Sequence, residues 1–456
     1  MKIKIIFLII LVQISLFGFN LNWNEPQISS NCNLFFLAEN VTETVPLLSE
    51  NFSLLHYSTK KSKIEMSFFS GNDFVAKSDS MYDFFYLGAE INANIKNKLL
   101  FHTNCWSGYF FGDTDFAFAH SPLNDGWTYN SDIPMLDNVT GNMTYLAEFA
   151  KISVGRGKHQ IGSNIAGSII LNDKSDDYGY FSANFNFGKI SLQFLHATLI
   201  PDGIDTLYFY KNYDDKYFVT HKINWSPNSN FELFIGEHIV YGSRSVDPNY
   251  LLPHTFYRIT EHRLNDRDNA LIYSGLNWKF HHNNFYFNFI FDELVPAEFF
   301  ANPNDWRNKY AIQMGNSLKF NDAKATIEFV AVRPWMYTHK ALPNKFSHNQ
   351  VGLGFTNGSN LMQISTELNY EFNDFSFDTN CIYLKQGGIG NDFSINYNDR
   401  PDDVAVWFAG EITEKIILQQ TVNWLINKNQ KIKCGLAKKF LDEDDLVISI
   451  GYQYKY

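Results

Sequence analysis

The chain has 456 residues, a formal net charge of −11 and an aromatic content of 17%. Its acidic balance, with no stripe of Lys and Arg to neutralise phosphates, excludes a nucleic-acid-binding protein, so nucleic acid is not expected among its partners. The cysteines lie far apart without a CxxC pair. Isolated thiols are therefore expected, and a Cys32–Cys105 or Cys381–Cys434 disulfide stays an open alternative.

The N-terminal residues predict export. Lys2 and Lys4 precede an almost wholly apolar run at 5–19, which indicates a secretory signal peptide at residues 1–19, cleaved near 18–20. The run is shorter than the roughly 20 residues that a membrane-spanning helix needs. Residues 20–53 are the least strand-like part and are expected to form a periplasmic extension or a plug. Residues 20–456 are otherwise expected to be one domain.

The middle of the chain alternates short apolar strands with turn residues. Residues 270–280 and 285–291 predict a hairpin across 281–284, because alternate residues of the second strand, all phenylalanine, share one face. Further hairpins are expected around 373–374 and 427–429. Longer stretches, expected to be extracellular loops or material folded into a lumen, are 201–216, 243–268, 293–309, 334–349 and 386–403.

The last residues, 446–456, predict a closing strand of an outer-membrane barrel. One face carries only apolar and aromatic side chains, namely Leu446, Ile448, Ile450, Tyr452, Tyr454 and Tyr456. A tilted strand of about ten residues crosses a bilayer. The aromatic C-terminus also resembles the signal that the barrel insertion machinery recognises. An edge strand of a soluble sandwich is the alternative.

Together these patterns predict an all-β fold, a transmembrane antiparallel outer-membrane β-barrel. A chain of this length accommodates about 16–18 strands at roughly ten membrane residues each. The expected location is the outer membrane, with outer-membrane lipid and the barrel insertion machinery as partners.

Four ordered blocks within roughly residues 150–370 carry a family resemblance. The first is the run 154–173, with Gly155, Arg156, Gly162 and Gly167, in which Asn172 stands where serine is common. The others are Gly236, Glu237, Tyr241, Gly242, Arg244, Asp247, Pro248, Tyr250 to Pro253, Tyr257, Glu261 and Asp266 to Ala270; then Asp292, Glu293, Trp306, Lys309 and Gly315; then Arg333 to His339, His348, Gly352 and Gly354. In these blocks the chain resembles the Wzi-like capsule assembly family. The resemblance implies an outer-membrane barrel lectin that attaches capsular or other surface polysaccharide to the cell, and it does not extend to a periplasmic helical bundle.

Polysaccharide binding requires flat apolar faces for sugar rings and fixed hydrogen-bonding groups for hydroxyls or uronates. The candidates are Trp335, Tyr337, His339, Tyr241, Tyr250 and Tyr257 for stacking, and Arg244, Arg333, Asp247 and Glu261 for polar contacts. An arginine fork would suit a polymer carboxylate. The alternative is that these charges pair with one another inside the barrel and that the aromatics form interfacial girdles.

Catalysis and cofactors are not expected. The glycines from 155 to 167 suggest a phosphate loop, but residues 168–171 are expected to continue as a strand, and a phosphate loop needs a helix there. Asp292 and Glu293 are adjacent on a strand and would point to opposite faces, and the histidines form no compact zinc-ligand set. No cofactor or metal is therefore predicted.

The expected function is non-catalytic polysaccharide anchoring, and a diffusion porin or sugar-uptake channel is the alternative. The two differ in the lumen. An anchor can be plugged below an exposed mouth that carries Arg244, Arg333 and Trp335, whereas a channel would have these residues around an open constriction.

Overall fold

The structure is a computed structural model, and it describes residues 55–59, 61–120, 135–202, 215–293, 296–441 and 445–455. The expected signal peptide and the expected extension at 20–53 lie outside these residues. Within them, eighteen antiparallel strands form a closed barrel, because β2 pairs with β3 on one side and with β21 on the other. The predicted all-β barrel and its strand number are confirmed.

The barrel strands are β2 (Ser62–Lys77), β3 (Ser80–Ile95), β4 (Leu99–Gly112), β5 (Met135–Leu146), β6 (Ala150–Gly157), β7 (Tyr178–Asn186), β8 (Ile190–Leu199), β9 (Lys216–Asn228), β10 (Phe231–Gly242), β11 (Asn269–Phe280), β12 (Asn283–Glu293), β13 (Lys309–Phe320), β14 (Ala323–Val332), β17 (Leu361–Phe372), β18 (Phe375–Gly387), β19 (Ile412–Asn427), β20 (Gln430–Leu441) and β21 (Leu446–Lys455). A short strand, β1 (Leu55–Ser58), pairs with the start of β2, and β15 (Ser347–His348) pairs with β16 (Val351–Gly352) inside one connection.

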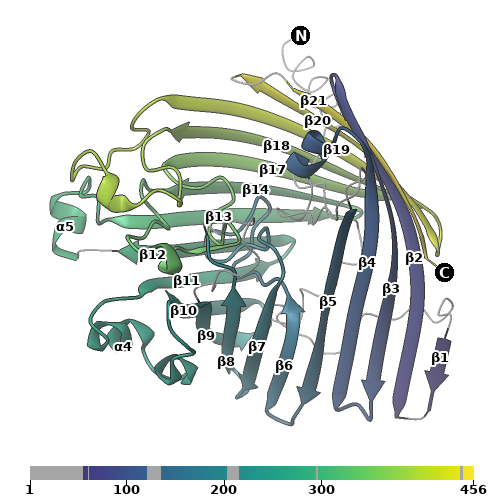
Figure 1. Cartoon of the computed structure of the whole chain (residues 1–456), viewed down its shortest axis with the longest axis horizontal. Helices are drawn as coiled ribbons and strands as arrows, with labels where there is room; N and C mark the ends of the chain where they lie inside the picture. The colour runs from purple at the N-terminus through teal and green to yellow at the C-terminus, as the bar shows by residue number, and fades with distance from the viewer. Residues whose placement is uncertain are drawn as a thin grey trace.

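The two ends of the barrel differ in their connections. At the short-turn end, two residues join β11 to β12, β17 to β18 and β19 to β20, so the predicted hairpins are confirmed. At the opposite, long-connection end, the described residues include three short α-helices, α3 (Thr114–His120), α4 (Tyr257–Arg263) and α5 (Pro296–Ala301). Figure 1 shows α4 and α5 projecting together on this side. None of the described helices is both long and apolar enough to cross a membrane.

Side chains alternate between the outer wall and the lumen as expected. In β21, Leu446, Ile448, Ile450 and Tyr452 are exposed on the outside, whereas Ser449 and Gly451 are buried. In β12 the four phenylalanines are partly exposed, and Tyr286, Asn288, Ile290 and Asp292 between them are buried. The barrel therefore has an apolar outer wall and a mixed inner wall, the arrangement of an outer-membrane barrel.

Inner-wall aromatic rings lie over glycines on neighbouring strands. Tyr86 lies over Gly71, Phe69 over Gly88 and Tyr286 over Gly315, so closely that a Cβ at Gly71 would be 2.1 Å from the Tyr86 ring. These residues are direct partners in the antiparallel ladders. Glycine lets the ring lie flat against the sheet, which packs the inner wall without another layer of side chains.

All cysteine thiols in the described part are free, namely Cys105, Cys381 and Cys434. The Cys381–Cys434 disulfide that the sequence left open is therefore not formed, and Cys32 of the other alternative lies outside the described residues. Cys105 and Cys434 are exposed on the outer wall.

Candidate functional site

The connection between β6 and β7, residues 158–177, folds into the lumen and is held there by hydrogen bonds from the barrel wall. The buried Glu328 carboxylate accepts the backbone N–H groups of Ile165 and Ala166 at 3.0 and 3.3 Å. Tyr286 and Gln313 also donate to this carboxylate, at 2.7 and 3.0 Å. Four donors on one buried acceptor fix the position of the connection in the lumen.

The expectation that residues 168–171 continue as a strand is wrong. They form irregular backbone, joined to the rest of the connection by an isolated bridge between Ile161 and Leu171. Gly162 and Gly167 have φ values of +96° and +103°, which break an extended run, and the Ser168 hydroxyl donates to the Ile161 carbonyl. No helix follows, so these glycines shape a lumen loop.

A hydrophobic cluster fills the lumen around this connection. Ile161, Ile169, Ile170 and Leu171 are fully buried against inner-wall residues of β7 to β14, β17 and β18. The connection between β14 and β17 adds Met336, Tyr337, Phe346, Leu353 and Phe355 to the same cluster. This part of the lumen is therefore a packed core made by two connections and the wall.

The first group of predicted site residues lies in the connection between β10 and β11. Arg244 donates to both carboxylate oxygens of Asp268, at 2.8 and 2.7 Å, and its guanidinium lies 4.7 Å from the centre of the Tyr241 ring. Tyr250 donates to the same Asp268 at 2.7 Å. Asp247 receives Arg244 and Arg267 at 3.4 and 3.3 Å. These contacts bring Arg244, Asp247 and Tyr250 together as one network.

The pKa of Asp247 is lowered. Burial alone would raise it, but hydrogen bonds from Asn249 and the charge of Arg244 stabilise the carboxylate. The Asp247 carboxylate is therefore ionised over the physiological pH range, and its ion pair with Arg244 is kept.

Tyr257 and Glu261 lie at the edge of this network, on α4. The Tyr257 ring stacks on His221 with 4.2 Å between ring centres, and its backbone N–H donates to Glu237 at 2.6 Å. Glu261 is fully buried and receives Arg258 at 2.9 Å. Burial raises the pKa of Glu261 to about 7. Tyr257 thus fixes α4 against β9 and β10, whereas the Glu261–Arg258 pair lies within α4.

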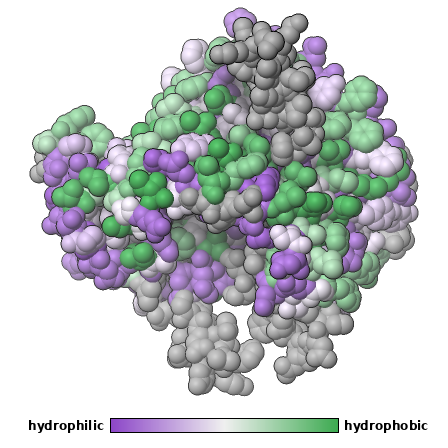
Figure 2. Space-filling view, turned by 90° about the horizontal axis from the view of Figure 1, so that it is seen from above, coloured by the Kyte–Doolittle hydropathy of each residue, from purple (hydrophilic) through white to green (hydrophobic). Residues whose placement is uncertain are grey.

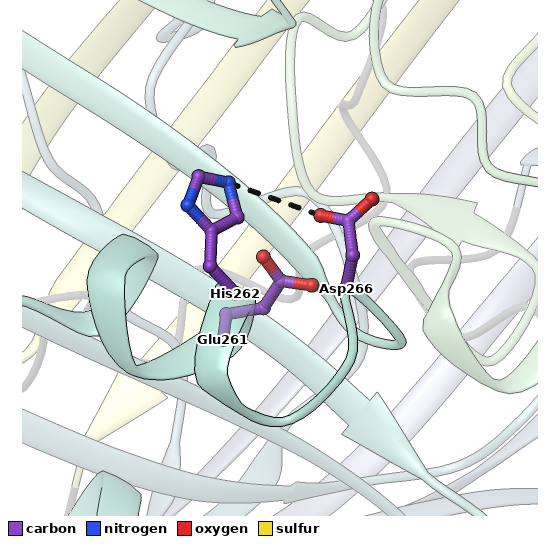
Figure 3. Close-up of side chains that lie close together, drawn as sticks. All are labelled: Glu261, His262 and Asp266. Carbon is purple, nitrogen blue, oxygen red and sulfur yellow. Dashed lines mark ion pairs between the residues drawn. The ribbon is translucent and has the colours of Figure 1, made fainter.

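Glu261, His262 and Asp266 lie close enough together to be compared with a metal site (Figure 3). Arg258 contacts both carboxylates, Glu261 at 2.9 Å and Asp266 at 3.5 Å, while His262 lies 3.9 Å from Asp266. A cation at this point would face the guanidinium charge. The group is therefore better described as an ion-pair network than as a metal centre.

The second group of predicted site residues lies in the connection between β14 and β17, and most of it is buried. Arg333 is 1% exposed and donates to the carbonyls of Asn308, Pro303 and Ala405 at 3.3, 3.1 and 2.8 Å. Its cation thus ties three connections together. Tyr337 donates to the Ile169 carbonyl at 2.7 Å and so joins this connection to the lumen loop.

Trp335 and His339 complete this second group. Trp335 is 4% exposed and packs against Gly390, where any Cβ would be 2.8 Å from the indole. His339 is 7% exposed, and burial lowers its pKa to about 4, so the ring is neutral at physiological pH. The edge of His339 faces Tyr397 at 6.2 Å between ring centres.

Sequence reasoning missed a partly exposed aromatic cluster at the long-connection end, which we call the Trp306 cluster. It comprises Trp306, Tyr397, Arg400 and Lys309. Arg400 lies 3.8 Å from the Trp306 ring centre, Lys309 lies 4.9 Å from that of Tyr397, and the two rings are 5.1 Å apart. Buried Lys309 is held by Asp292 and Glu293 at 3.2 and 3.4 Å.

The Trp306 cluster has the features that stacking on sugar rings requires, the role expected of the predicted aromatic residues. Its rings are partly exposed and fixed by cations, so they offer rigid apolar surface beside charged groups. Trp306 and Lys309 stood in a resemblance block, but Tyr397 comes from a connection about ninety residues later. The only sequence signal was an aromatic residue within the predicted loop 386–403.

Hydrophobic and hydrophilic side chains interleave over this end of the molecule. Figure 2 shows purple and green residues side by side at the left of the view, the side on which Figure 1 shows α4 and α5. Such a mixed surface suits a ligand that presents both apolar faces and hydroxyls.

Comparisons with known proteins define the class. No family model matches the sequence, and no curated protein matches it. Among solved structures, the chain is similar to Wzi of Escherichia coli, described as an outer membrane protein involved in group 1 capsule assembly and a carbohydrate-binding β-barrel, at 12% identity over 85% of this chain and 83% of that one, with a TM-score of 0.55. It is also similar to OccD3 (OpdP) of Pseudomonas aeruginosa, at 9% identity over 86% of this chain and 91% of that one, TM-score 0.51. OccAB3 of Acinetobacter baumannii matches at 9% identity over 87% of this chain and 100% of that one, TM-score 0.50.

At such low identities the similarity shows the fold alone. The barrel fold matches that of outer-membrane proteins, and this chain has the fold of an outer-membrane β-barrel.

Proposed function

We propose that this barrel binds a surface or capsular polysaccharide at its long-connection end and holds it to the cell without catalysis. Outer-membrane barrels carry their longer loops outside the cell, so this end would face the exported polymer. The observation that carries the proposal is the presence of a packed lumen cluster together with the partly exposed rings of the Trp306 cluster, which cations hold in place. The carbohydrate binding described for the similar Wzi barrel supports it.

In this proposal the contacts to sugar are divided between two sets of residues. Trp306 and Tyr397 stack on sugar rings, and Arg244, whose side chain is 21% exposed, takes polymer hydroxyls or carboxylates. The other predicted site residues shape the loops that present these groups; they are Asp247, Tyr250, Tyr257, Glu261, Arg333, Trp335, Tyr337 and His339. Many weak contacts along one polymer would add up through avidity.

A channel is the second candidate, and a specific feature favours it. The inner wall near the short-turn end is polar, with Glu65, Glu90, Asn92 and His102 on β2 to β4. A porin would continue this polar surface through the barrel. The apolar cluster between β7 and β18 supports the anchor instead, because its packed side chains fill this part of the lumen.

The proposal includes export and insertion. The signal peptide at residues 1–19 would direct secretion, and the aromatic last strand would be recognised by the insertion machinery. N-terminal sequencing of the mature protein from outer-membrane fractions tests the cleavage.

The direct test is the partition of surface polysaccharide between cells and medium, normalised to total polymer, in strains with and without this gene. Loss of cell-bound polymer and its reappearance in the medium, reversed by the intact gene, is the expected result. An unchanged partition would reject the anchor.

A further inference from the structure

The barrel wall is interrupted beside β5. β5 pairs with β4 from Met135 to Tyr145, but β6 pairs with it only from Gly141 onward. The β6 side of residues 135–140 therefore has no β6 partner, and Figure 1 shows β5 extending beyond β6 and β7. Side chains satisfy part of this edge: the Val139 N–H donates to the Asn138 amide oxygen at 2.8 Å, and the Asn138 amide donates to Asp177 at 2.7 Å.

A cavity of about 890 Å³ opens at this interruption, and we call it the wall groove. Its floor follows one hydrogen-bonded row across the outer wall, from Phe68 on β2 through Ala89 and Cys105 to Val139 on β5. Three strand spacings make this row about 14 Å long. Beyond β5 the groove continues to residues of the lumen connections.

The floor of the wall groove suits a hydrocarbon chain. Ala89 and Cys105 are small, while Phe68, Leu87 and Val139 beside them are exposed and apolar. These residues point outward on a wall that faces lipid in an outer-membrane barrel. An acyl chain in this groove would contact protein on more than one side, whereas a chain against the flat outer wall contacts protein on one side only.

The far end of the wall groove is polar. Arg156 is exposed there, and among the described residues no carboxylate lies within ion-pair distance of its guanidinium. Asp176 accepts a hydrogen bond from the Asn349 amide at 2.5 Å, and both line the groove. Arg156 can bind an acidic group through its planar fork, and the carboxylates of Asp137 and Asp176 can accept hydroxyl hydrogens.

We propose that the wall groove binds a glycolipid, with its acyl chain along the row from Phe68 to Val139 and its acidic, hydroxylated sugar head at Arg156 and Asp176. A phospholipid could supply the chain and the acidic group but lacks the sugar hydroxyls that the two carboxylates would accept. The inference rests on the proposed function, because the glycolipid is then the lipid-linked end of the polysaccharide. Asp176 and Asn349 belong to the connections that fill the lumen, so the groove joins the lipid-facing wall to these connections.

The free thiols allow a matched test. Two full-length single-cysteine proteins retain either Cys105, in the groove, or Cys434, which is exposed on the outer wall of β20, and all other cysteines are replaced by serine. Each is labelled with bimane and placed in phosphatidylcholine nanodiscs. The probe is a stearyl β-glucuronide with a dibrominated chain, which quenches bimane on contact, and dibrominated phosphatidylcholine is the comparison.

The glucuronide is expected to quench Cys105 at an about tenfold lower mole fraction than Cys434, since one charge-assisted contact of about 1.4 kcal/mol gives that ratio. The variant Arg156→Gln should remove most of this preference. Equal quenching of both positions by the glucuronide would overturn the proposal. Quenching of Cys105 by brominated phosphatidylcholine as strong as by the glucuronide would show a general lipid groove and overturn the glycolipid assignment.

The proposed function fails independently of this result. If deletion of the gene leaves the polymer partition unchanged while the glucuronide still quenches Cys105 in preference to Cys434, the anchoring function is rejected, and the glycolipid assignment of the wall groove is kept. If partition changes and the preference is absent, the anchor stands and the groove assignment is rejected.

Discussion

Arg244 clasps Asp268 with two parallel hydrogen bonds of 2.8 and 2.7 Å, and the Asp268 side chain is fully buried immediately before β11. The pair closes the connection between β10 and β11 at its base. Because Tyr250 donates to the same carboxylate, the whole network depends on this clasp.

Arg244→Lys should loosen the connection without unfolding the barrel. Lysine cannot reproduce the bidentate fork, and weakening a charge-assisted pair on a buried carboxylate costs about 1–3 kcal/mol. Hydrogen exchange across residues 243–268 should accelerate, and polymer binding should fall. Arg267→Lys is the control, because Arg267 makes a longer contact to Asp247 and is 47% exposed. Equal effects of the two changes would contradict the importance of the clasp.

Glu328→Ala should release the lumen connection. The substitution leaves the N–H groups of Ile165 and Ala166 and the Gln313 amide without their acceptor, and each unsatisfied buried donor costs about 1–3 kcal/mol. In planar bilayers the intact protein should show little conductance, and the variant should conduct more. Glu371→Ala, at an exposed carboxylate of the short-turn end, is the control. A large conductance of the intact protein would favour the channel.

The connection that contains Glu261 should be more stable at mildly acidic than at alkaline pH. Burial raises the pKa of Glu261 from 4.5 to about 7. The folded state therefore binds the proton more tightly than the unfolded chain, and stability falls as pH rises from about 4.5 through about 7. Limited proteolysis of residues 243–268 should be slower at pH 5 than at pH 8. Glu261→Gln should flatten this dependence, and a dependence that runs in the opposite direction would contradict the assignment.

Trp306→Ala and Tyr397→Ala should each weaken polymer binding about three- to tenfold, the equivalent of one lost aromatic contact of about 0.7–1.4 kcal/mol. Binding of purified polymer to nanodisc-embedded protein measures this. Trp424→Ala is the control, because Trp424 is an exposed tryptophan that lies on the outer wall near the short-turn end, stacked on Phe375. Unchanged binding by both mouth variants would remove the Trp306 cluster from the site.

The sequence predicted the wall much better than the interior. A strand exposes alternate residues to two different solvents, so the phenylalanines of β12 and the last strand could be assigned to the outer face from spacing alone. The turns between strands were equally visible, because a two-residue connection needs turn-forming residues such as Asn373 and Asp374.

Loops carry no such periodicity, so the sequence did not show which of their aromatic residues are exposed. Tyr250 and Tyr337 have the composition expected of sugar-binding residues, yet both are buried, one against Asp268 and the other against the lumen loop. Which loop enters the lumen depends on partners far away in the chain, such as Glu328 for residues 165–166. The pairing of Trp306 with Tyr397 is equally long-range, so residue type alone could not separate binding aromatics from packing aromatics.

Gly71→Ala should destabilise the barrel, because the added Cβ would be 2.1 Å from the Tyr86 ring. The ring has little room to move, since it is 1% exposed and stacked on Phe84 with 5.6 Å between ring centres. Overpacking of this kind costs about 1–3 kcal/mol. The urea midpoint of the folded band in unheated gels should fall accordingly.

Gly179→Ala is the control for this change, because nothing lies within 4 Å of the Cβ position at Gly179 on β7. It should leave the midpoint nearly unchanged. The double variant Gly71→Ala with Tyr86→Leu should be less destabilised than the sum of its two single variants, since the smaller side chain relieves the clash. Strict additivity would mean that the glycine is required for another reason, and the flat packing of Tyr86 over Gly71 would then not limit stability.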